Sequence, residues 1–199
     1  VNNNSTDNTE KIVKTFKNKL NLRIVFEKEK GRGFARRAGF AVAKGDVILS
    51  TDADTIVPKN WINEMTRLFQ GNTIVAVTGP SRVTDRNAFM NTFFSTCQPI
   101  AMKLYRFFVG HYWLSGFNFA IRRDIYEKSG GFKEMDAQED TDLSFRVSKL
   151  GKITYNPHWK VVVSGRRFQQ GVLKGVYNYV DTYTKLFIFR KPVYLSNER

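Results

Sequence analysis

Cysteine and histidine are scarce in this chain of 199 residues, which has one of the former and two of the latter. The single Cys97 excludes an intrachain disulfide and a structural zinc site built from cysteines, and it fits a reducing compartment. His111 and His158 have no partner at a metal-ligand spacing. Either could complete a metal site in the folded chain, but an ordinary structural role is the better interpretation of both.

Acidic residues are also few: 18 Asp and Glu stand against 32 Lys and Arg, and the net charge is +14. A charge of this size fits three kinds of partner, namely nucleic acid, an anionic membrane surface, or a phosphate-rich substrate. The hydrophobic fraction of 42% is enough for one well-packed domain and is not that of a disordered chain. Composition therefore leaves the partner open.

Long apolar runs are missing. No uninterrupted stretch reaches the roughly 18 residues that cross a bilayer, and no signal peptide is recognisable. Because the chain starts at Val1 within an apparent strand end, we expect the natural N-terminus to lie upstream.

The C-terminal part, 171–199, reads as an amphipathic helix and tail containing Phe187-Ile188-Phe189-Arg190-Lys191. Such a helix suits an anchor at an anionic membrane surface, and a helix packed on the core with solvated lysines fits the pattern as well. Arg166-Arg167 can bind a phosphate or a lipid headgroup, or form a solvated pair.

Strand-like and helix-like patterns alternate along the rest of the chain. We expect strands at 22–26, 46–50, 74–78, 114–121, 153–155 and 160–164. We expect helices at 9–19 with a cap at Ser5 or Asp7, from the glycine segment to a cap at Gly45, at 58–69, at 89–109 with a break near Pro99, at 123–129 and at 141–150. This alternation predicts a single α/β domain with a mostly parallel sheet and a ligand site at the carboxyl ends of its strands.

The triplet Asp52-Ala53-Asp54 directly follows the apolar strand DVILS, which we expect to be central in the sheet. Mg²⁺ and Mn²⁺ sites commonly use one or two protein carboxylates, with water and substrate phosphates as the other ligands. Asp-x-Asp also occurs in ordinary turns. Its place at a buried strand end favours a site for a divalent metal and a diphosphate.

Two other charged groups have both a structural and a functional interpretation. Glu139-Asp140 can stabilise a helix N-terminus through the macrodipole, or supply a general base that deprotonates an acceptor hydroxyl. Spacing alone favours the first. Arg32, Arg36 and Arg37 lie in a glycine-containing segment that can form a solvated helix face or bind diphosphate oxygens.

Four segments in order carry a family resemblance: VNNNSTDNT, GFARRAGFAVAKGDVILSTDAD, LSGFNFAIRRDIYEKSGGF and QEDTDLSFRVSKLGK. Together they resemble the family 2 glycosyltransferases over nearly the whole chain. The resemblance implies inverting chemistry and a GT-A fold, which is Rossmann-like, with a mostly parallel mixed sheet and helices on both faces. Residues 1–170 would form this catalytic domain, without the strand–helix unit with which the family usually begins.

The resemblance also implies roles for the acidic residues. Asp54 matches the likelier direct metal ligand of the family's Asp-x-Asp, and Asp52 the residue nearer the ribose or diphosphate. Asp140 matches the catalytic base, and Glu139 the residue that contacts the acceptor or orients the loop. On this ground the functional interpretation of the acidic pair replaces the structural one. The implied cofactor is Mn²⁺ or Mg²⁺.

Five other residues match the family's substrate-binding positions. Ser115, Gly116 and Asn118 match the loop on the acceptor and donor-sugar side of the cleft. Asn3 stands where an acid commonly contacts the nucleoside, and Arg36 matches the arginine of the basic segment. The implied partners are a nucleoside-diphosphate sugar and a hydroxyl acceptor, lipid-linked or part of a cell-surface glycan. Because many relatives act on such acceptors, the resemblance also implies a cytoplasmic protein, peripheral at the inner face of the membrane.

The sequence is compatible with three alternative functions. The first is metal-dependent, inverting sugar transfer from a nucleotide donor. The second is a basic nucleic-acid-binding module, which the net charge favours but which gives no reason for a cluster of carboxylates. The third is an inactive glycosyltransferase-like fragment.

Overall fold

The computed structural model describes residues 1–71, 73–135 and 138–168. The predicted C-terminal helix in 171–199 lies outside these residues. Within the described ranges, no helix combines the length and the apolar character needed to cross a bilayer.

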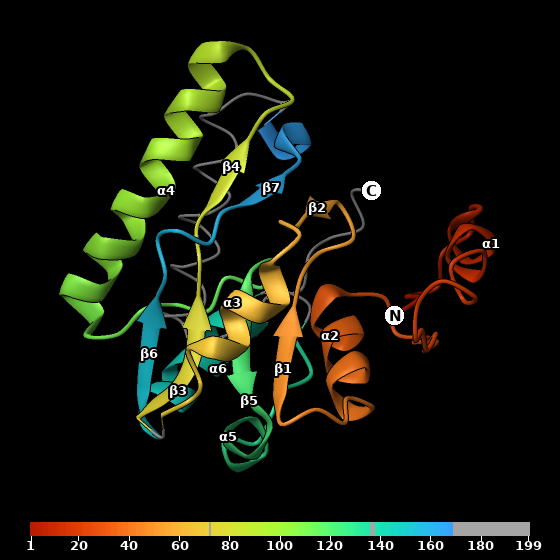
Figure 1. The fold of residues 1–199 in the computed structure, drawn as a ribbon, viewed down its shortest axis with the longest axis horizontal. Helices are drawn as coiled ribbons and strands as arrows, with labels where there is room; N and C mark the ends of the chain where they lie inside the picture. Colours follow the sequence, from red (N-terminus) through yellow and green to blue (C-terminus); the bar gives the residue numbers. More distant parts are fainter. Residues whose placement is uncertain (72, 136–137, 169–199) are drawn as a thin grey trace.

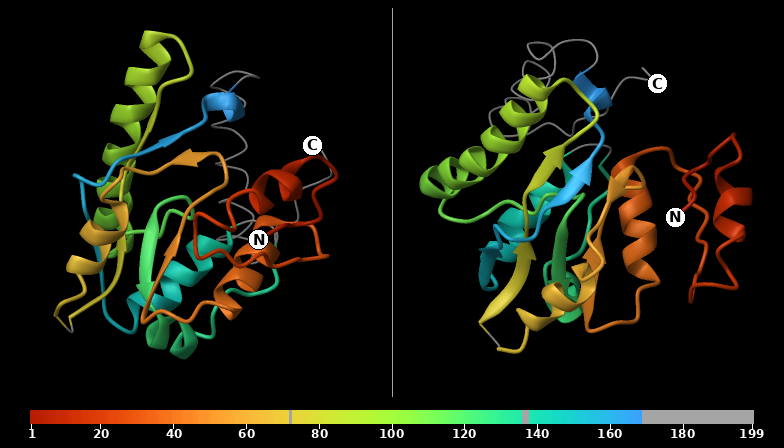
Figure 2. Two further views of the ribbon diagram at one scale, coloured as in Figure 1. Left: turned by 45° about the vertical axis from the view of Figure 1, so that its right-hand side comes forward. Right: turned by 45° about the horizontal axis from the view of Figure 1, so that its top comes forward.

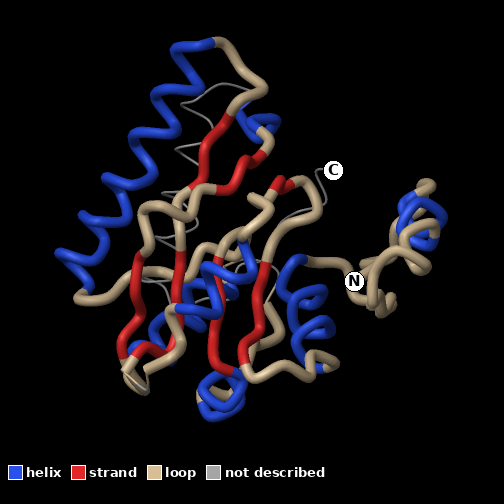
Figure 3. The backbone as a smooth tube through the Cα atoms, in the orientation of Figure 1, coloured by secondary structure: helices blue, strands red, loops and turns tan. Residues whose placement is uncertain are grey.

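A four-stranded sheet forms the centre of the molecule (Figures 1 and 3). Its order is β1 (Val47–Ser50), β5 (Phe119–Arg122), β3 (Ile74–Thr78) and β6 (Lys152–Tyr155). β5 runs antiparallel to β1 and β3, while β3 and β6 are parallel. Three of the four strands therefore point the same way, and the prediction of an α/β domain with a mostly parallel mixed sheet is confirmed.

Helices cover both faces of this sheet. The helices of the described residues are α1 Thr9–Lys14, α2 Arg32–Ala41, α3 Trp61–Arg67, α4 Ala88–Val109, α5 Arg123–Lys128 and α6 Glu139–Ser148, followed by a 3₁₀ turn at Gly165–Phe168. One core cluster joins residues of α2, α5 and α6 to the sheet, and the other joins residues of α3 to the opposite face. Along β5, Phe119 and Ile121 belong to the first cluster and Ala120 to the second, as the two-residue period of a strand requires.

A second, smaller sheet lies beyond the carboxyl end of the main one. It consists of β2 (Thr55–Ile56), β7 (Val161–Val163) and β4 (Ser81–Val83), with β7 in the middle. Of these strands only β7 is predicted from the sequence, through its run of three β-branched valines. β2 and β4 are too short to show a period, and they lack such a run. This sheet places the segment after Asp54 beside the end of β7, as both views in Figure 2 show.

Two predictions about the N-terminal part are wrong. The segment 22–26 is not a strand, because it meets the chain start through a single bridge between Asn2 and Phe26 and has no ladder of hydrogen bonds. The first helix ends at Lys14, and its N-cap is Asn8 rather than Ser5 or Asp7. Residues 1–30 lie beside α2, away from the main sheet (Figure 1).

Three further expectations need correction. The helix after the glycine segment ends at Ala41, so Gly45 is not its cap. Pro99 does not interrupt the long helix, since α4 continues through it with Pro99 inside; the lost hydrogen bond is one among many in 22 residues. The strand β1 stands at one end of the four-stranded sheet rather than at its centre.

Candidate active site

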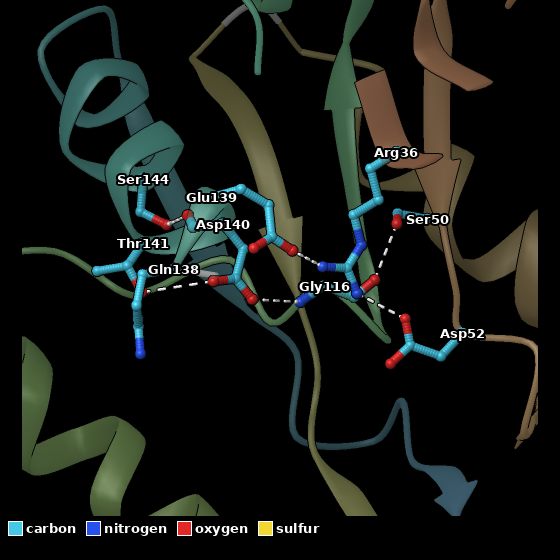
Figure 4. A network of polar contacts seen from close by, with 9 residues as sticks. All are labelled: Arg36, Ser50, Asp52, Gly116, Gln138, Glu139, Asp140, Thr141 and Ser144. Atoms are coloured by element: carbon cyan, nitrogen blue, oxygen red, sulfur yellow. Dashed lines mark hydrogen bonds and ion pairs between the residues drawn. The ribbon is translucent and has the colours of Figure 1, made fainter. Parts of the chain in front are cut away.

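The guanidinium of Arg36 joins two carboxylates from distant parts of the chain (Figure 4). Arg36 lies on α2, Asp52 lies two residues after the end of β1, and Glu139 is the first residue of α6. Nη1 of Arg36 donates to Oε1 of Glu139, and Nη2 donates to Oδ1 of Asp52 at 2.5 Å. Side-chain exposure is 11% for Arg36 and 2% for Glu139, so this ion pair is almost dry. The fold thus connects the Asp triplet to the acidic pair.

The electrostatics of this group follow from burial and from the three acids around Arg36. Burial, together with the charge of neighbouring Asp140, raises the pKa of Glu139, and Arg36 opposes that rise. Burial by itself would lower the pKa of Arg36, but the carboxylates of Glu139, Asp52 and Asp140 outweigh it and the pKa is raised. Arg36 is therefore a permanent cation among carboxylates in a desolvated site.

Asp140 is half-buried and keeps one oxygen in a hydrogen bond with the backbone. The N–H of Gly116 donates to Oδ2 of Asp140 at 3.0 Å. On the other side, the Thr141 hydroxyl contacts Oδ1 at 3.4 Å and donates to Oε1 of Gln138 at 2.7 Å. The acidic pair forms the first turn of α6 instead of preceding it. The helix dipole therefore stabilises these carboxylates in addition to any chemical role.

Gly116, in the loop before β5, contacts Ser50 and Asp140 through its backbone. Its carbonyl accepts from the Ser50 hydroxyl at 2.8 Å, while its N–H contacts Asp140. A Cβ added at Gly116 would lie 2.3 Å from atoms of the Arg36 guanidinium. Only glycine lets the arginine pass this close to the loop.

Ser115 and Asn118 are fully buried. Asn118 accepts from Trp61 Nε1 at 2.9 Å and donates to the carbonyls of Trp159 and Pro80 at 2.8 and 3.2 Å. Its side chain is thereby committed to internal contacts that position the loop. Ser115 differs, because its hydroxyl is buried with no hydrogen-bond partner.

Asp54 lies at the surface and points to a different cation. Its Oδ2 accepts from Nη2 of Arg166 at 2.8 Å, in a pair that is exposed on both sides. Among the residues that the structure describes, no three His, Cys, Asp or Glu side chains gather as a ready-made metal site. Asp52 and Asp54 still fit a hard divalent cation, because such ions commonly take one or two protein carboxylates and complete their shell with phosphate oxygens and water.

Asn3 organises the turn before α2. Its amide nitrogen donates to the carbonyls of Glu27 and Glu29 at 3.1 and 2.6 Å, and its Oδ1 accepts from the N–H of Gly31 at 2.9 Å. These bonds occupy the side chain, and a nucleoside contact by Asn3 stays a prediction.

Sequence analysis missed two residues at this site. From the sequence, Arg166 is recognisable only as one residue of the basic pair Arg166-Arg167. No local pattern indicates that it follows β7 to a position beside Asp54. Tyr105 lies on the inner side of α4, where burial and then the charge of Asp140 raise the pKa of its hydroxyl. His111 packs edge-on against Tyr105 and Phe145, in keeping with a structural role.

Comparison with known proteins identifies the family. The model described as Glycosyl transferase family 2 matches residues 1–130. A bacterial relative, "Probable glycosyltransferase YdaM" of Bacillus subtilis (strain 168), is 35% identical over 164 residues, which is 76% of this chain. The chain belongs to glycosyl transferase family 2. The chain covers 39% of that relative's length.

Solved structures agree on the fold of this family 2 member, which is GT-A. The mannosyltransferase PcManGT from Pyrobaculum calidifontis, in complex with GDP-Man and Mn²⁺, has a TM-score of 0.60 at 20% identity and covers 89% of this chain. TarS residues 1–349 of S. aureus, in complex with UDP-GlcNAc, has a TM-score of 0.63 at 17% identity over 82% of this chain. The chain spans 53% and 48% of these two structures.

Proposed function

We propose that this family 2 protein transfers a sugar from a nucleoside-diphosphate donor to a hydroxyl acceptor with inversion at the anomeric carbon. The observation that supports it best is the Arg36 bridge, which sets Asp52 and the Glu139-Asp140 pair around one buried cation. An ordinary helix cap gives no reason to join these acids across the sheet. The nucleic-acid-binding alternative is not favoured by any contact at this site.

Asp140 is the proposed general base. Its Oδ2 is aligned by the Gly116 N–H, and Glu139 is held beside it by Arg36. Asp140 accepts the proton of the acceptor hydroxyl, whose oxygen forms the new bond to the anomeric carbon as the bond to the diphosphate oxygen breaks. The electron pair of that broken bond leaves with the diphosphate.

Asp54 and Asp52 are the proposed ligands of a divalent metal, Mn²⁺ or Mg²⁺. The GDP-Man and Mn²⁺ of the mannosyltransferase complex support this choice of cofactor. When bound, the metal neutralises the charge that develops on the leaving diphosphate. Arg166 holds Asp54 at the surface and must share or release that carboxylate when the metal binds. The two structures named above contain a GDP sugar and a UDP sugar, which makes these two nucleotides the first donors to test.

The proposal places the protein at the cytoplasmic face of a membrane, acting on a lipid-linked or cell-surface glycan acceptor. The net charge of +14 supports an anionic surface as a partner.

The deciding experiment compares Asp140→Asn with a matched control, Asp124→Asn. Asp124 also lies in the first turn of a helix, but it is exposed and forms its ion pair with Lys128 on the same helix α5. Asp140→Asn is expected to lower sugar transfer by at least about a hundredfold, the usual contribution of a general base, with donor affinity retained. Asp124→Asn should transfer normally. Near-normal turnover by Asp140→Asn would remove Asp140 from the base role, and inactivity of the wild type with every donor would favour the inactive-fragment alternative.

A further inference from the structure

The helix α4 turns its apolar side chains outward. Of its 22 residues only Met102 is buried, although the helix packs along β4. Five large apolar side chains on the other side are 40% to 80% exposed: Phe89, Phe93, Ile100, Leu104 and Phe107. Their separations of four, seven, four and three residues keep them on one side of a helix with 3.6 residues per turn.

This stripe reverses the usual pattern of a surface helix, which directs its apolar face to the core. Here the inward side includes Asn91, Gln98 and Tyr105, all less exposed than the stripe. Eighteen residues separate Phe89 from Phe107, so the stripe is about 27 Å long. Exposed apolar surface of this extent marks an interaction site, and α4 stands at the outside of the molecule in Figures 1 and 2.

The charge around the stripe is mostly positive. α4 has no carboxylate, and its charged residues are Lys103 and Arg106. The adjoining β4 and loop add Arg82 and Arg86 and one acid, Asp85, whose carboxylate already accepts from Ser164 and Gly165. A surface that pairs aromatic side chains with basic ones is complementary to an anionic lipid interface.

We propose that the outer side of α4 is a membrane-docking surface that lies on an anionic lipid interface, with the Phe89–Phe107 stripe at the boundary between headgroups and acyl chains. The inference rests on the membrane position in the proposed function and names the surface responsible. It also assigns the contact to α4 instead of the C-terminal segment. Lys103 is exposed beside the stripe and would face the headgroups, while the Arg106 guanidinium stacks on the Tyr112 ring.

The position of α4 links the proposed membrane-docking surface to the candidate active site. Tyr105, on the inner side of the same helix, is packed against Trp113, two residues before Ser115, and lies within the electrostatic reach of Asp140. A helix whose outer side meets lipid and whose inner side borders the base would bring a lipid-linked acceptor to the site of transfer.

The test is flotation of the full chain with vesicles of phosphatidylcholine alone and with about one quarter phosphatidylglycerol. The key variant is Phe89→Ser with Phe107→Ser, two positions exposed enough that folding should be unaffected. The matched control is Ile12→Ser with Ile62→Ser, two exposed apolar residues on α1 and α3. The wild type and the control should float with the anionic vesicles, and the key variant should bind them at least about tenfold more weakly.

Three results would overturn the inference. In the first, the wild type does not float with anionic vesicles. In the second, the α4 variant floats normally while the double variant Phe187→Ser with Phe189→Ser does not. In the third, light scattering shows a wild-type dimer that the α4 variant abolishes. The second assigns the contact to the C-terminal segment, and the third to a second copy. Transfer to a soluble acceptor, measured on the same samples, should be unchanged in the α4 variant, so a failure of the chemistry and a failure of the docking surface are distinguishable.

Discussion

At the residue scale, Arg36 determines how the acids of this family 2 protein are arranged. A buried carboxylate such as Glu139 is costly unless a cation compensates it, and Arg36 does so while also contacting Asp52. The guanidinium can reach both acids only because residue 116 has no side chain. Three residues far apart in the sequence therefore depend on one another.

Gly116→Ala tests this dependence. The new methyl group would overlap the Arg36 guanidinium, whose atoms lie 2.3 Å from the Cβ position, and must displace it from Glu139 or Asp52. We expect sugar transfer to fall by at least about tenfold and unfolding free energy to fall by on the order of 1–3 kcal/mol. Gly71→Ala is the control, since nothing lies within 4 Å of a Cβ there. Unchanged activity in Gly116→Ala would mean that the Arg36 bridge is dispensable.

Glu139→Gln tests the electrostatics of the bridge through pH. The pKa of Glu139 is raised above its ordinary 4.5, so the folded state holds this proton more tightly than the unfolded state does. Its contribution to stability is therefore fully present below pH 4.5 and is lost as pH rises through the raised pKa. Denaturant unfolding across this window should show a wild-type slope more negative than that of Glu139→Gln, by at most about 1.4 kcal/mol per pH unit. Equal slopes would contradict the raised pKa.

At the scale of elements, loops and short strands fix the positions of the site residues more than the four-stranded sheet does. The loop before β5 is held by Asn118, which bonds to Trp61 of α3 and to carbonyls beside both sheets. The two-residue β2 pairs with β7 and brings Arg166 to Asp54. These small contacts join the two sheets into one frame for the acids.

Asn118→Ala should destabilise this frame. The change would leave Trp61 Nε1 without its acceptor and the Trp159 carbonyl without the Asn118 donor, while the Pro80 carbonyl keeps the Val161 N–H. Each unsatisfied buried group costs about 1–3 kcal/mol. We expect a loss of on the order of 2–5 kcal/mol in unfolding free energy by denaturant titration. Asn63→Ala, at an exposed position of α3, should change it by less than about 0.5 kcal/mol. A loss no greater than that of the control would show that other bonds hold the loop.

At the scale of the whole molecule, positive charge surrounds a small acidic centre. The chain has a net charge of +14, while Asp52, Glu139 and Asp140 gather around Arg36. The proposed nucleoside-diphosphate donor would be attracted by the overall field, yet it would meet carboxylates at the strand ends unless a divalent cation lay between them. Donor binding and metal binding should therefore be coupled.

Thermal unfolding with UDP-, GDP- and dTDP-sugars, each with and without Mn²⁺, measures this coupling. We expect one nucleotide to raise Tm only when Mn²⁺ is present, because a ligand that binds the folded state stabilises it. EDTA should reverse the shift, and Asp54→Asn should abolish it. Asp46→Asn is the control, since Asp46 is an exposed acid before β1. A shift that survives EDTA would exclude metal-dependent donor binding.

Local chemistry made part of this architecture readable from the sequence. DVILS and IVAVT are apolar enough to indicate buried strands, and the helices α3, α5 and α6 are found to within a few residues. The prediction of a strand at 22–26 was wrong, because β propensity indicates an extended segment but does not provide a neighbouring strand to pair with it. The ordered motifs, not any single one, identified the family.

What the sequence determined by itself was the family, the α/β class and the order of the acidic groups, because these follow from local pattern and motif spacing. Only the tertiary structure decided that Arg36 joins Asp52 to Glu139, that Arg166 meets Asp54, and that the apolar side of α4 faces outward. The physical reason is that ion pairs and exposure depend on which elements are neighbours in space. A one-dimensional pattern gives the period of a helix but not the side on which the core lies.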